Sequence, residues 1–419
     1  MNCWLITVGE PLPMVDPGNP RLLRTGTLAR RLSERGNSVL WWTSTFDHYR
    51  KVHRAEADQS FAWEGGKIRM LHSVGYKRNV SLRRFIEHAG VARKFAEQAP
   101  AEDRPDIILA SLPTVELARE AVRFGQQHGV PVLLDLRDLW PDLLIDVAPP
   151  RLRWLSRWLF RGMLADTHRA MAAADGLVGI SEGYLAWGLQ YAGRSRRHPD
   201  AMIPLGYVAP SASQTSGETD RRMLALGIDP NGVLCWYVGS FGRQYDLDPV
   251  LGAARAFQAA GRNNVQFVIS GDGERGSRWR AEAQDLRNVV FTGWIGADEI
   301  NWLRTHAAIG LQPYVAGAPQ GLANKLFEYL SAGIPVVSSL AGENQALITD
   351  HNCGLTYRAG DAIDCARCIR QLLDVPGMRK RMGDNGKRLF DQKYDGRAVF
   401  ETLVEHLETV ACRHVQLNP

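Results

Sequence analysis

The sequence predicts two doubly wound α/β domains, each with a parallel sheet that helices cover on both faces. Three observations support this fold class. Short apolar segments alternate with amphipathic ones in both halves of the chain, as expected when buried parallel strands are joined by helical crossovers. The 419 residues exceed what one hydrophobic core usually holds. A stretch rich in Pro, Gly, Ser and Thr separates the two halves, as a linker would.

The first half contains five segments with the length and apolar composition of buried strands. They are CWLITV (3–8), SVLWWTS (38–44), PDIILAS (105–111), VPVLLDL (130–136) and GLVGIS (176–181). Three further segments show the apolar spacing of helices and cover residues 25–36, 114–129 and 182–193. Gly36 ends the first helix, because glycine readily takes the left-handed conformation that follows a helix end.

The second half repeats this alternation after the linker. Its expected strands are VLCWYVGS (233–240), VQFVISG (265–271), NVVFTGW (288–294), AAIGLQPY (307–314) and IPVVSS (334–339), and residues 247–261 form a helix. We place the first domain at residues 1–207, the linker at 208–232 and the second domain at 233–395. A helical pattern over about 396–419 has no strand after it and is expected to complete the first domain. Ligands of doubly wound sheets bind outside the carboxyl ends of the strands, so the cleft between the two domains is the expected site.

Composition excludes several classes of protein. The apolar share of 45% and the charged share of 23% are typical of a soluble globular chain, and the net charge of +5 is a mild excess that does not indicate a nucleic-acid partner. No apolar run approaches the ~20 residues that span a bilayer. The start, MNCWLITVGEP, lacks the basic region of a signal peptide. The six cysteines are scattered, and Cys365-x-x-Cys368 has no second pair or histidine cluster beside it, so we expect packed thiols in a reducing cytoplasm.

The stretch PQGLANKLFEYLSAGIPVVSS (319–339) predicts a helix with marked ends. Asn324 is a suitable N-cap, and Gly333 and Pro335 end the helix. Lys325 and Glu328 lie three residues apart on one flank. They form either a surface ion pair, worth roughly 0.2–0.5 kcal/mol, or part of a site in which the helix N-terminus holds a phosphate and a ribose.

Glycine-rich turns follow two strands of the second half. Gly239-Ser240-Phe241-Gly242-Arg243 follows one strand, and Gly271-Asp272-Gly273-Glu274 follows the next. Either turn alone is most simply a tight turn, although glycine also lets a backbone approach a ligand closely. Neither is a full dinucleotide fingerprint, and no P-loop occurs, so nicotinamide and P-loop enzymes are not supported. Arg243, Lys325 and the helix N-terminus would bring three positive elements to one crevice.

The segments YVGSFGRQYDLDPVLGAA, FVISGDGE, NVVFTGWI, QGLANKLFEYLSAGIPVVSS and CGLTYRAGD together resemble the carboxyl-terminal half of family-4 glycosyltransferases. RTGTLARRLSERGNSVLWWTSTFDH and LLDLRDLWPDL fit the amino-terminal half, so the resemblance covers nearly the whole chain. It is closest to the bacterial branch that builds O-antigen and capsule, which includes N-acetyl-L-fucosamine transferases. The resemblance implies the GT-B fold, retention of anomeric configuration, a UDP-sugar donor and no obligatory metal or other cofactor.

The family signature is a pair of glutamates eight positions apart. Its second glutamate corresponds to Glu328, which is expected to bind the ribose hydroxyls. Its first position holds Gln320, a departure, because glutamine can still hydrogen-bond to the donor sugar but carries no charge. The backbone N–H groups of Gly321, Leu322 and Ala323 would face the sugar and the diphosphate.

Two further departures concern charged positions. Ser240 and Tyr245 occupy the places where most of the family has Arg and Lys for the diphosphate, and we expect Arg243 and Lys325 to substitute for them. A His-Asp pair near the donor sugar reads Arg137-Asp138 here. The resemblance thus implies catalytic roles for Asp138, Arg137 and Gln320, and a nucleotide-sugar-binding set. That set is Gly239, Ser240, Arg243, Gly271, Trp294, Gly321, Leu322, Ala323, Asn324, Lys325 and Glu328.

The stretch RLRWLSRWLFRGMLADTHR (Arg151–Arg169) combines an apolar stripe with recurring arginines. Trp154, Leu155, Trp158, Leu159 and Met163 would form the stripe, and Arg153, Arg157 and Arg161 the charged edge. Such a helix either docks on a membrane surface or covers the sheet with a solvated face. We predict a transferase of the cytoplasmic membrane face with a lipid-linked or saccharide acceptor. The alternatives are a GT-B UDP-N-acetylhexosamine epimerase and a non-catalytic nucleotide-sugar-binding protein.

Overall fold

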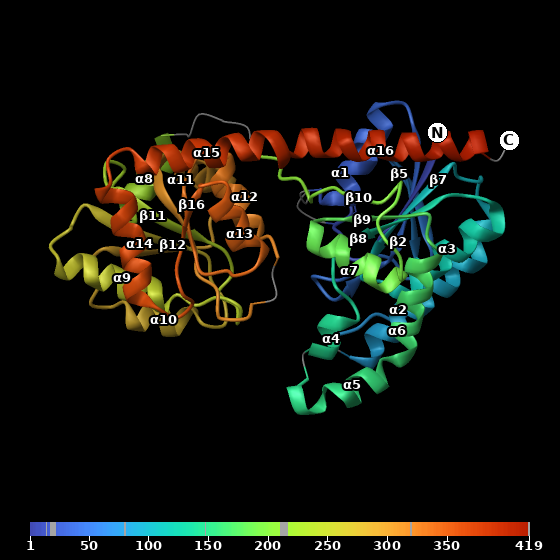
Figure 1. Ribbon diagram of the computed structural model, residues 1–419, viewed down its shortest axis with the longest axis horizontal. Helices are drawn as coiled ribbons and strands as arrows, with labels where there is room; N and C mark the ends of the chain where they lie inside the picture. The colour runs from blue at the N-terminus through green and yellow to red at the C-terminus, as the bar shows by residue number, and fades with distance from the viewer. Residues whose placement is uncertain are drawn as a thin grey trace. The chain divides into compact units, whose positions relative to one another are not determined.

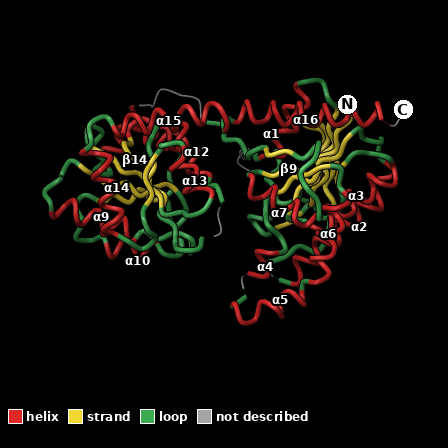
Figure 2. Tube along the Cα trace, viewed as in Figure 1, coloured by secondary structure: helices red, strands yellow, loops and turns green. Residues whose placement is uncertain are grey.

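The computed structural model describes residues 1–13, 15–16, 22–78, 81–146, 148–209, 217–318 and 321–417. The chain forms two compact units (Figure 1). Unit 1 contains Met1–Gly206 and Arg397–Pro419, and unit 2 contains Tyr207–Gly396. In each unit the strands form a central sheet with helices around it, as Figure 2 shows.

Unit 1 is built on an eight-stranded sheet of order β10-β9-β8-β7-β1-β2-β6-β5. The strands are β1 (Asn2–Ile6), β2 (Ser38–Ser44), β5 (Gln59–Trp63), β6 (Gly66–Leu71), β7 (Ile107–Leu112), β8 (Val132–Leu136), β9 (Gly176–Gly179) and β10 (Ala201–Met202). All neighbours pair in parallel except β5 and β6. The strand order reverses between β1 and β7, so a ligand crevice is expected at their carboxyl ends.

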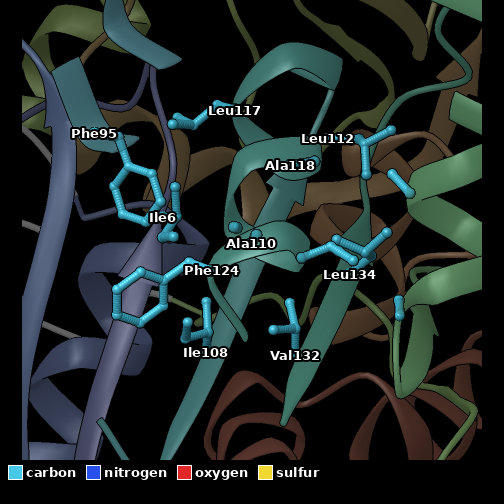
Figure 3. Close-up of a cluster of buried hydrophobic side chains, with 14 of the residues drawn as sticks. Ile6, Phe95, Ile108, Ala110, Leu112, Leu117, Ala118, Phe124, Val132 and Leu134 are labelled. Atoms are coloured by element: carbon cyan, nitrogen blue, oxygen red, sulfur yellow. The ribbon is translucent and has the colours of Figure 1, made fainter. Parts of the chain in front are cut away.

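Helices cover both faces of this sheet because alternate strand residues point to opposite faces. Along β1, Trp4 and Ile6 enter one core cluster, and Cys3 and Leu5 enter the other. Figure 3 shows part of the first cluster, in which Phe95 and Phe124 pack near Ile6 and Ile108. The helices are α1 (Arg24–Glu34), α2 (Leu82–Gln98), α3 (Val115–His128), α4 (Asp142–Asp146), α5 (Arg153–Leu159), α6 (Arg161–Ala173), α7 (Glu182–Ala192) and α16 (Gly396–Leu417). A short hairpin, β3 (Phe46–Asp47) and β4 (Val52–His53), and two 3₁₀ turns, Ala99–Ala101 and Pro150–Leu152, complete the unit.

Unit 2 is built on a six-stranded parallel sheet of order β13-β12-β11-β14-β15-β16. The strands are β11 (Val233–Val238), β12 (Val265–Ser270), β13 (Val289–Gly293), β14 (Ala307–Gln312), β15 (Val336–Ser338) and β16 (Gly354–Thr356). The helices are α8 (Gly217–Ala225), α9 (Asp248–Ala259), α10 (Gly276–Glu282), α11 (Ala297–His306), α12 (Asn324–Ser331), α13 (Glu343–Asp350), α14 (Ala362–Asp374) and α15 (Met378–Lys393). The order reverses between β11 and β14, which directs attention to the loops after these strands.

Three sequence-based assignments need correction. Part of the predicted linker, 208–232, is helix α8, whose Met223 is fully buried in the unit 2 core. The Pro- and Ser-rich composition before α8 led to the linker assignment, although Met223 attaches the helix to the core. Asn324 is the first residue of α12 and not its N-cap, which is Ala323. The stripe from Trp154 to Met163 is interrupted, because α5 ends before Phe160 and α6 begins after it.

The two chain segments at the unit boundary pair with each other inside unit 2. The Tyr207 N–H donates to the Tyr394 carbonyl at 3.0 Å, and the Gly396 N–H donates to the Tyr207 carbonyl at 3.0 Å. A Cβ atom at Gly396 would lie 2.6 Å from Val208 Cγ2, so only glycine fits this approach. Within the described ranges, no helix is both long enough and apolar enough to span a bilayer.

Candidate nucleotide-sugar site

Lys325 projects from the first turn of α12 into a group of three tyrosines. Its ammonium lies 3.7 Å from the ring centroid of Tyr245, 4.8 Å from that of Tyr237 and 5.5 Å from that of Tyr314. Burial lowers the pKa of Lys325 to about 7. Burial also raises the pKa values of Tyr237 and Tyr314, so the rings present neutral hydroxyls at neutral pH. Cation–π contacts hold the ammonium, and no described carboxylate pairs with it.

The position of Lys325 explains the glycine after β11. Gly239 has φ +150°, and a Cβ atom there would lie 2.6 Å from Lys325 Nζ. Gly271, after β12, has φ +131°, and its Cβ would lie 1.9 Å from the Gly239 carbonyl oxygen. The two glycine turns therefore fit against each other, and the first one leaves room for the lysine. Both predicted glycines and Lys325 are brought together at the carboxyl ends of the strands.

Arg243 lies in the same loop but points to solvent. Its side chain is 81% exposed and pairs with Glu274 at 3.1 Å. This hydrogen-bonded pairing raises the pKa of Arg243 and lowers that of Glu274. Exposed pairs of this kind contribute little to stability and exchange partners readily, so the resting pair leaves Arg243 able to take an anion in place of Glu274.

The N-terminus of α12 has no side-chain cap among the described residues. Ala323 occupies the N-cap position and offers no side-chain acceptor, so the first N–H groups of the helix keep their partial positive charge. Gly321, Leu322 and Ala323 lead into this end, and Asn324 is exposed there. Gln320, the predicted sugar contact, lies outside the described residues.

Glu328 pairs with Arg304, and none of the ion pairs among the described residues joins it to Lys325. Its Oε1 accepts from Arg304 Nη1 at 2.8 Å, and its Oε2 accepts from the Tyr207 hydroxyl. Both partners of the Arg304–Glu328 pair are largely buried. The three-residue spacing of Lys325 and Glu328 therefore does not decide the partner of Glu328, because a buried arginine of α11 pairs with its carboxylate instead.

Two other predicted contacts flank the glycine turns. Ser240 is exposed, and its carbonyl accepts from the Tyr237 hydroxyl at 2.8 Å. Trp294 is 66% exposed and follows Gly293, whose carbonyl accepts from the Gly271 N–H at 2.8 Å. Both residues thus border the loops that hold Lys325, with their side chains open to solvent.

In unit 1, Arg137 belongs to a buried network of charges. Its Nε donates to Asp135 at 2.6 Å, its Nη1 pairs with Glu10, and its Nη2 donates to Thr25 at 3.0 Å. Arg24 donates to the same Asp135 oxygen at 3.1 Å. Burial raises the pKa of Asp135, but Arg137 and Arg24 outweigh it and hold the pKa below its usual range. The Arg137 guanidinium therefore has partners on all three nitrogens.

Asp138 lines a cavity of about 200 Å³ at the carboxyl ends of β1, β2, β7 and β8. Its Oδ1 accepts from the Leu139 N–H at 2.9 Å, and burial raises its pKa. Arg84 lines the same cavity and lies over the Trp140 ring at 4.3 Å. His88 lines it as well, and burial lowers the pKa of His88 to about 3, so this imidazole is neutral. The cavity offers acceptors, a guanidinium and neutral rings, which suits polyhydroxylated ligands.

Sequence reasoning missed Tyr237, Tyr314, Arg304 and Tyr207. These side chains come from a strand, a loop, a helix and the unit boundary, so no local spacing links them. The one available signal was Tyr245, which occupies the position where the resembled family has its lysine. The structure places the Lys325 ammonium against the Tyr245 ring. A lysine charge is thus present beside position 245, but it is supplied by a residue of α12.

Comparison with known proteins agrees with this architecture. Residues 232–375 match the family model described as "Glycosyl transferases group 1". The chain is 25% identical over 304 residues to the sulfoquinovosyl transferase SQD2 of Arabidopsis thaliana, covering 71% of this chain and 55% of that protein. It is 24% identical over 145 residues to the lipopolysaccharide core biosynthesis glycosyltransferase LpsD of Rhizobium meliloti (strain 1021), covering 34% and 41%. The matches thus span about half the length of these curated relatives.

Among solved structures, the chain is similar to Anabaena HepE in complex with UDP. The TM-score is 0.65 at 15% identity, covering 97% of this chain and 99% of that one. The predicted GT-B fold, with its two parallel-sheet α/β units and C-terminal helix, is confirmed. The segment that matches the family model lies within unit 2, the unit that carries Lys325 and the two glycine turns.

Proposed function

We propose that the chain is a retaining glycosyltransferase of family 4 that moves a sugar from a UDP-sugar to a lipid-linked or saccharide acceptor in surface polysaccharide synthesis. The observation that carries the proposal is the Lys325 ammonium beside the uncapped end of α12. A partly buried cation without a described counter-ion is unfavourable unless an anion reaches it. A diphosphate at the carboxyl ends of β11 and β14 would supply that anion.

The chemistry follows from where charge develops. As the bond between the anomeric carbon and the phosphate oxygen breaks, negative charge grows on that oxygen of the departing diphosphate, and the carbon becomes oxocarbenium-like. Fixed positive groups lower the barrier by roughly 2.7–4 kcal/mol for each well-placed donor. Lys325, the α12 N-terminus and Arg243, once released from Glu274, are the groups that would meet this charge. The cavity around Asp138 and Arg84 is proposed to hold the acceptor.

Turnover assays separate this function from its rivals. A thermal-shift screen of nucleotide sugars would first identify the donor, with UDP-sugars expected to raise the melting temperature. The donor should then release UDP and transfer sugar only when a lipid diphosphosugar or a saccharide is added, and NMR of the product should show the donor's anomeric configuration. Epimerised UDP-sugar without an acceptor would overturn the proposal, as would nucleotide binding without any turnover across the acceptor panel.

UDP binding should weaken as the pH rises above 7. The ammonium form of Lys325 attracts the diphosphate, and the pKa of this lysine in the free protein is about 7. Above that pH, binding must take up a proton, so affinity should fall by up to about tenfold per pH unit. Calorimetry between about pH 7 and 9, in buffers of different ionisation enthalpy, would measure the uptake. Lys325→Arg is the control, because its guanidinium stays protonated throughout. A pH-independent affinity in the parent protein would contradict this role.

We also propose that α5 contacts the membrane surface. Trp154 and Trp158 are 69% and 59% exposed, and α5 has no buried residue. Arg161 lies over the Trp158 ring at 4.8 Å, which leaves its charge beside the apolar face. Exposed tryptophans flanked by arginines are typical of helices that lie in an anionic lipid interface.

Neutralising Arg153, Arg157 and Arg161 to glutamine should weaken binding to vesicles that contain anionic lipid. Each lost charge should cost about 1 kcal/mol, most clearly at low salt. The matched control neutralises Arg30, Arg123 and Arg413, which are exposed on other helices. These three substitutions remove the same net charge. Vesicle sedimentation should show loss in the first variant alone. Equal loss in both variants would indicate a general charge effect, and no loss would leave the arginines as a solvated edge.

A further inference from the structure

The carboxylate of Glu328 is held by donors from two other parts of unit 2. Arg304, on α11, reaches Oε1 at 2.8 Å, and the Tyr207 hydroxyl reaches Oε2. The Arg304 and Glu328 side chains are only 10% and 14% exposed. Each carboxylate oxygen is therefore fixed by one donor, and rotation of the carboxylate about its last bond would break both contacts.

The two donors are themselves fixed. Helix α11 is anchored by Trp302, which is buried and whose Nε1 donates to Asp220 at 2.6 Å. Tyr207 is held through its backbone by Tyr394 and Gly396, as described above, and its ring packs on Phe390 with centroids 6.1 Å apart. The backbone that carries each donor is therefore held in place.

The carboxylate still has capacity for a ligand. An ionised carboxylate offers about four acceptor positions, and the described contacts use one on each oxygen. The remaining positions, one on each oxygen, match a pair of vicinal hydroxyl groups. A carboxylate fixed in one plane binds such a pair better than one that must be ordered first, because the ordering entropy is already spent.

We propose that Arg304 and Tyr207 are positioning residues that orient the Glu328 carboxylate toward both ribose hydroxyls of the donor nucleotide, and so give the site its preference for ribonucleotides. The inference deepens the proposed function and rests on the ribose role of Glu328. It adds two residues that neither the motif nor the resemblance indicates, and it states what they do: they act through Glu328 and do not touch the ligand.

The test compares UDP with 2′-deoxy-UDP by calorimetry in the parent and in variants. The parent should bind UDP about tenfold more tightly or better, because a hydrogen bond to a charged group is lost in the deoxy compound. In Tyr207→Phe and Arg304→Gln this preference should fall by at least about threefold, mainly through weaker binding of UDP. Arg304→Lys should restore part of it. Tyr394→Phe is the matched control, because it removes one hydroxyl from a neighbouring buried tyrosine that packs on Phe327.

Measuring a ratio separates positioning from folding. A variant that is merely destabilised binds both nucleotides less well by the same factor, and its melting temperature records the destabilisation. If the parent prefers UDP and both variants keep that preference in full, the positioning role is wrong while the ribose role of Glu328 stands. If the parent does not distinguish the two nucleotides, the ribose assignment of the proposed function fails, and the positioning role fails with it.

Discussion

Replacing Lys325 with methionine should weaken UDP binding by roughly 10- to 150-fold, the equivalent of about 1.5–3 kcal/mol for a hydrogen bond to a charged group. Methionine keeps an unbranched apolar stem against the three tyrosines and removes only the charge. Calorimetry with UDP measures the loss. Lys380→Met is the control, because Lys380 is 80% exposed on α15, outside the proposed site, and the variant removes the same charge. Unchanged affinity in Lys325→Met would remove the lysine from the diphosphate site.

The same variant should be at least as stable as the parent at pH 7. Burial lowers the pKa of Lys325 to about 7, whereas an unfolded lysine titrates near 10.4. Between these values the unfolded chain binds more protons, so this lysine reduces stability most at pH 7 and below, and the effect disappears as the pH rises toward 10. Thermal unfolding across this range should show the variant and the parent converging at high pH. A variant that melts well below the parent at pH 7 would show that the ammonium stabilises the empty site.

Replacing Asp135 with alanine should lower the free energy of unfolding by about 3–5 kcal/mol. Asp135 is fully buried between Arg24 and Arg137, and its loss leaves two buried guanidinium groups with one carboxylate, Glu10, between them. Denaturant unfolding measures the effect. UDP affinity should change little, because the proposed nucleotide contacts all lie in unit 2.

A surface pair of unit 1 provides the comparison for Asp135. Glu182 pairs with Arg196 at 3.3 Å, and their side chains are 62% and 49% exposed. Glu182→Ala should therefore cost no more than about 1 kcal/mol. Similar losses of unfolding free energy in the two variants would show that the buried network around Arg137 stabilises unit 1 no more than a surface ion pair does.

The sequence predicted those features of the fold that depend on residues close together in the chain. Strand β11 reads as a continuous apolar run because its sheet is covered on both faces, and α12 shows the apolar spacing of a helix that packs on one side. The glycines after β11 and β12 were identifiable because only glycine allows their backbone conformations and close approach. Patterns of this kind need no knowledge of distant partners.

The partners of charged side chains could not be read in this way. The three-residue spacing of Lys325 and Glu328 allowed a mutual pair as one alternative, but such a pair is worth only a few tenths of a kcal/mol. Tertiary contacts decide between partners whose energies differ so little. The Lys325 ammonium lies against the Tyr245 ring, and the Glu328 carboxylate pairs with Arg304. Composition gave the wrong assignment for α8 for a related reason. Packing of the buried methionine against the core stabilises the helix, although the sequence around it is polar.

Helix α16 has a consequence for how the protein is made. It contributes Leu403, Val404 and Leu407 to a core that it shares with helix α1 and with strands of the amino-terminal sheet, among them β1 and β2. The whole of unit 2 is translated between these two parts. At ribosomal speeds of roughly 5–20 residues per second, the nascent amino-terminal sheet must wait on the order of ten seconds or longer before α16 covers its part of this face. Unit 2 is one continuous stretch of chain and is complete before α16 is translated, so it is expected to finish folding before unit 1.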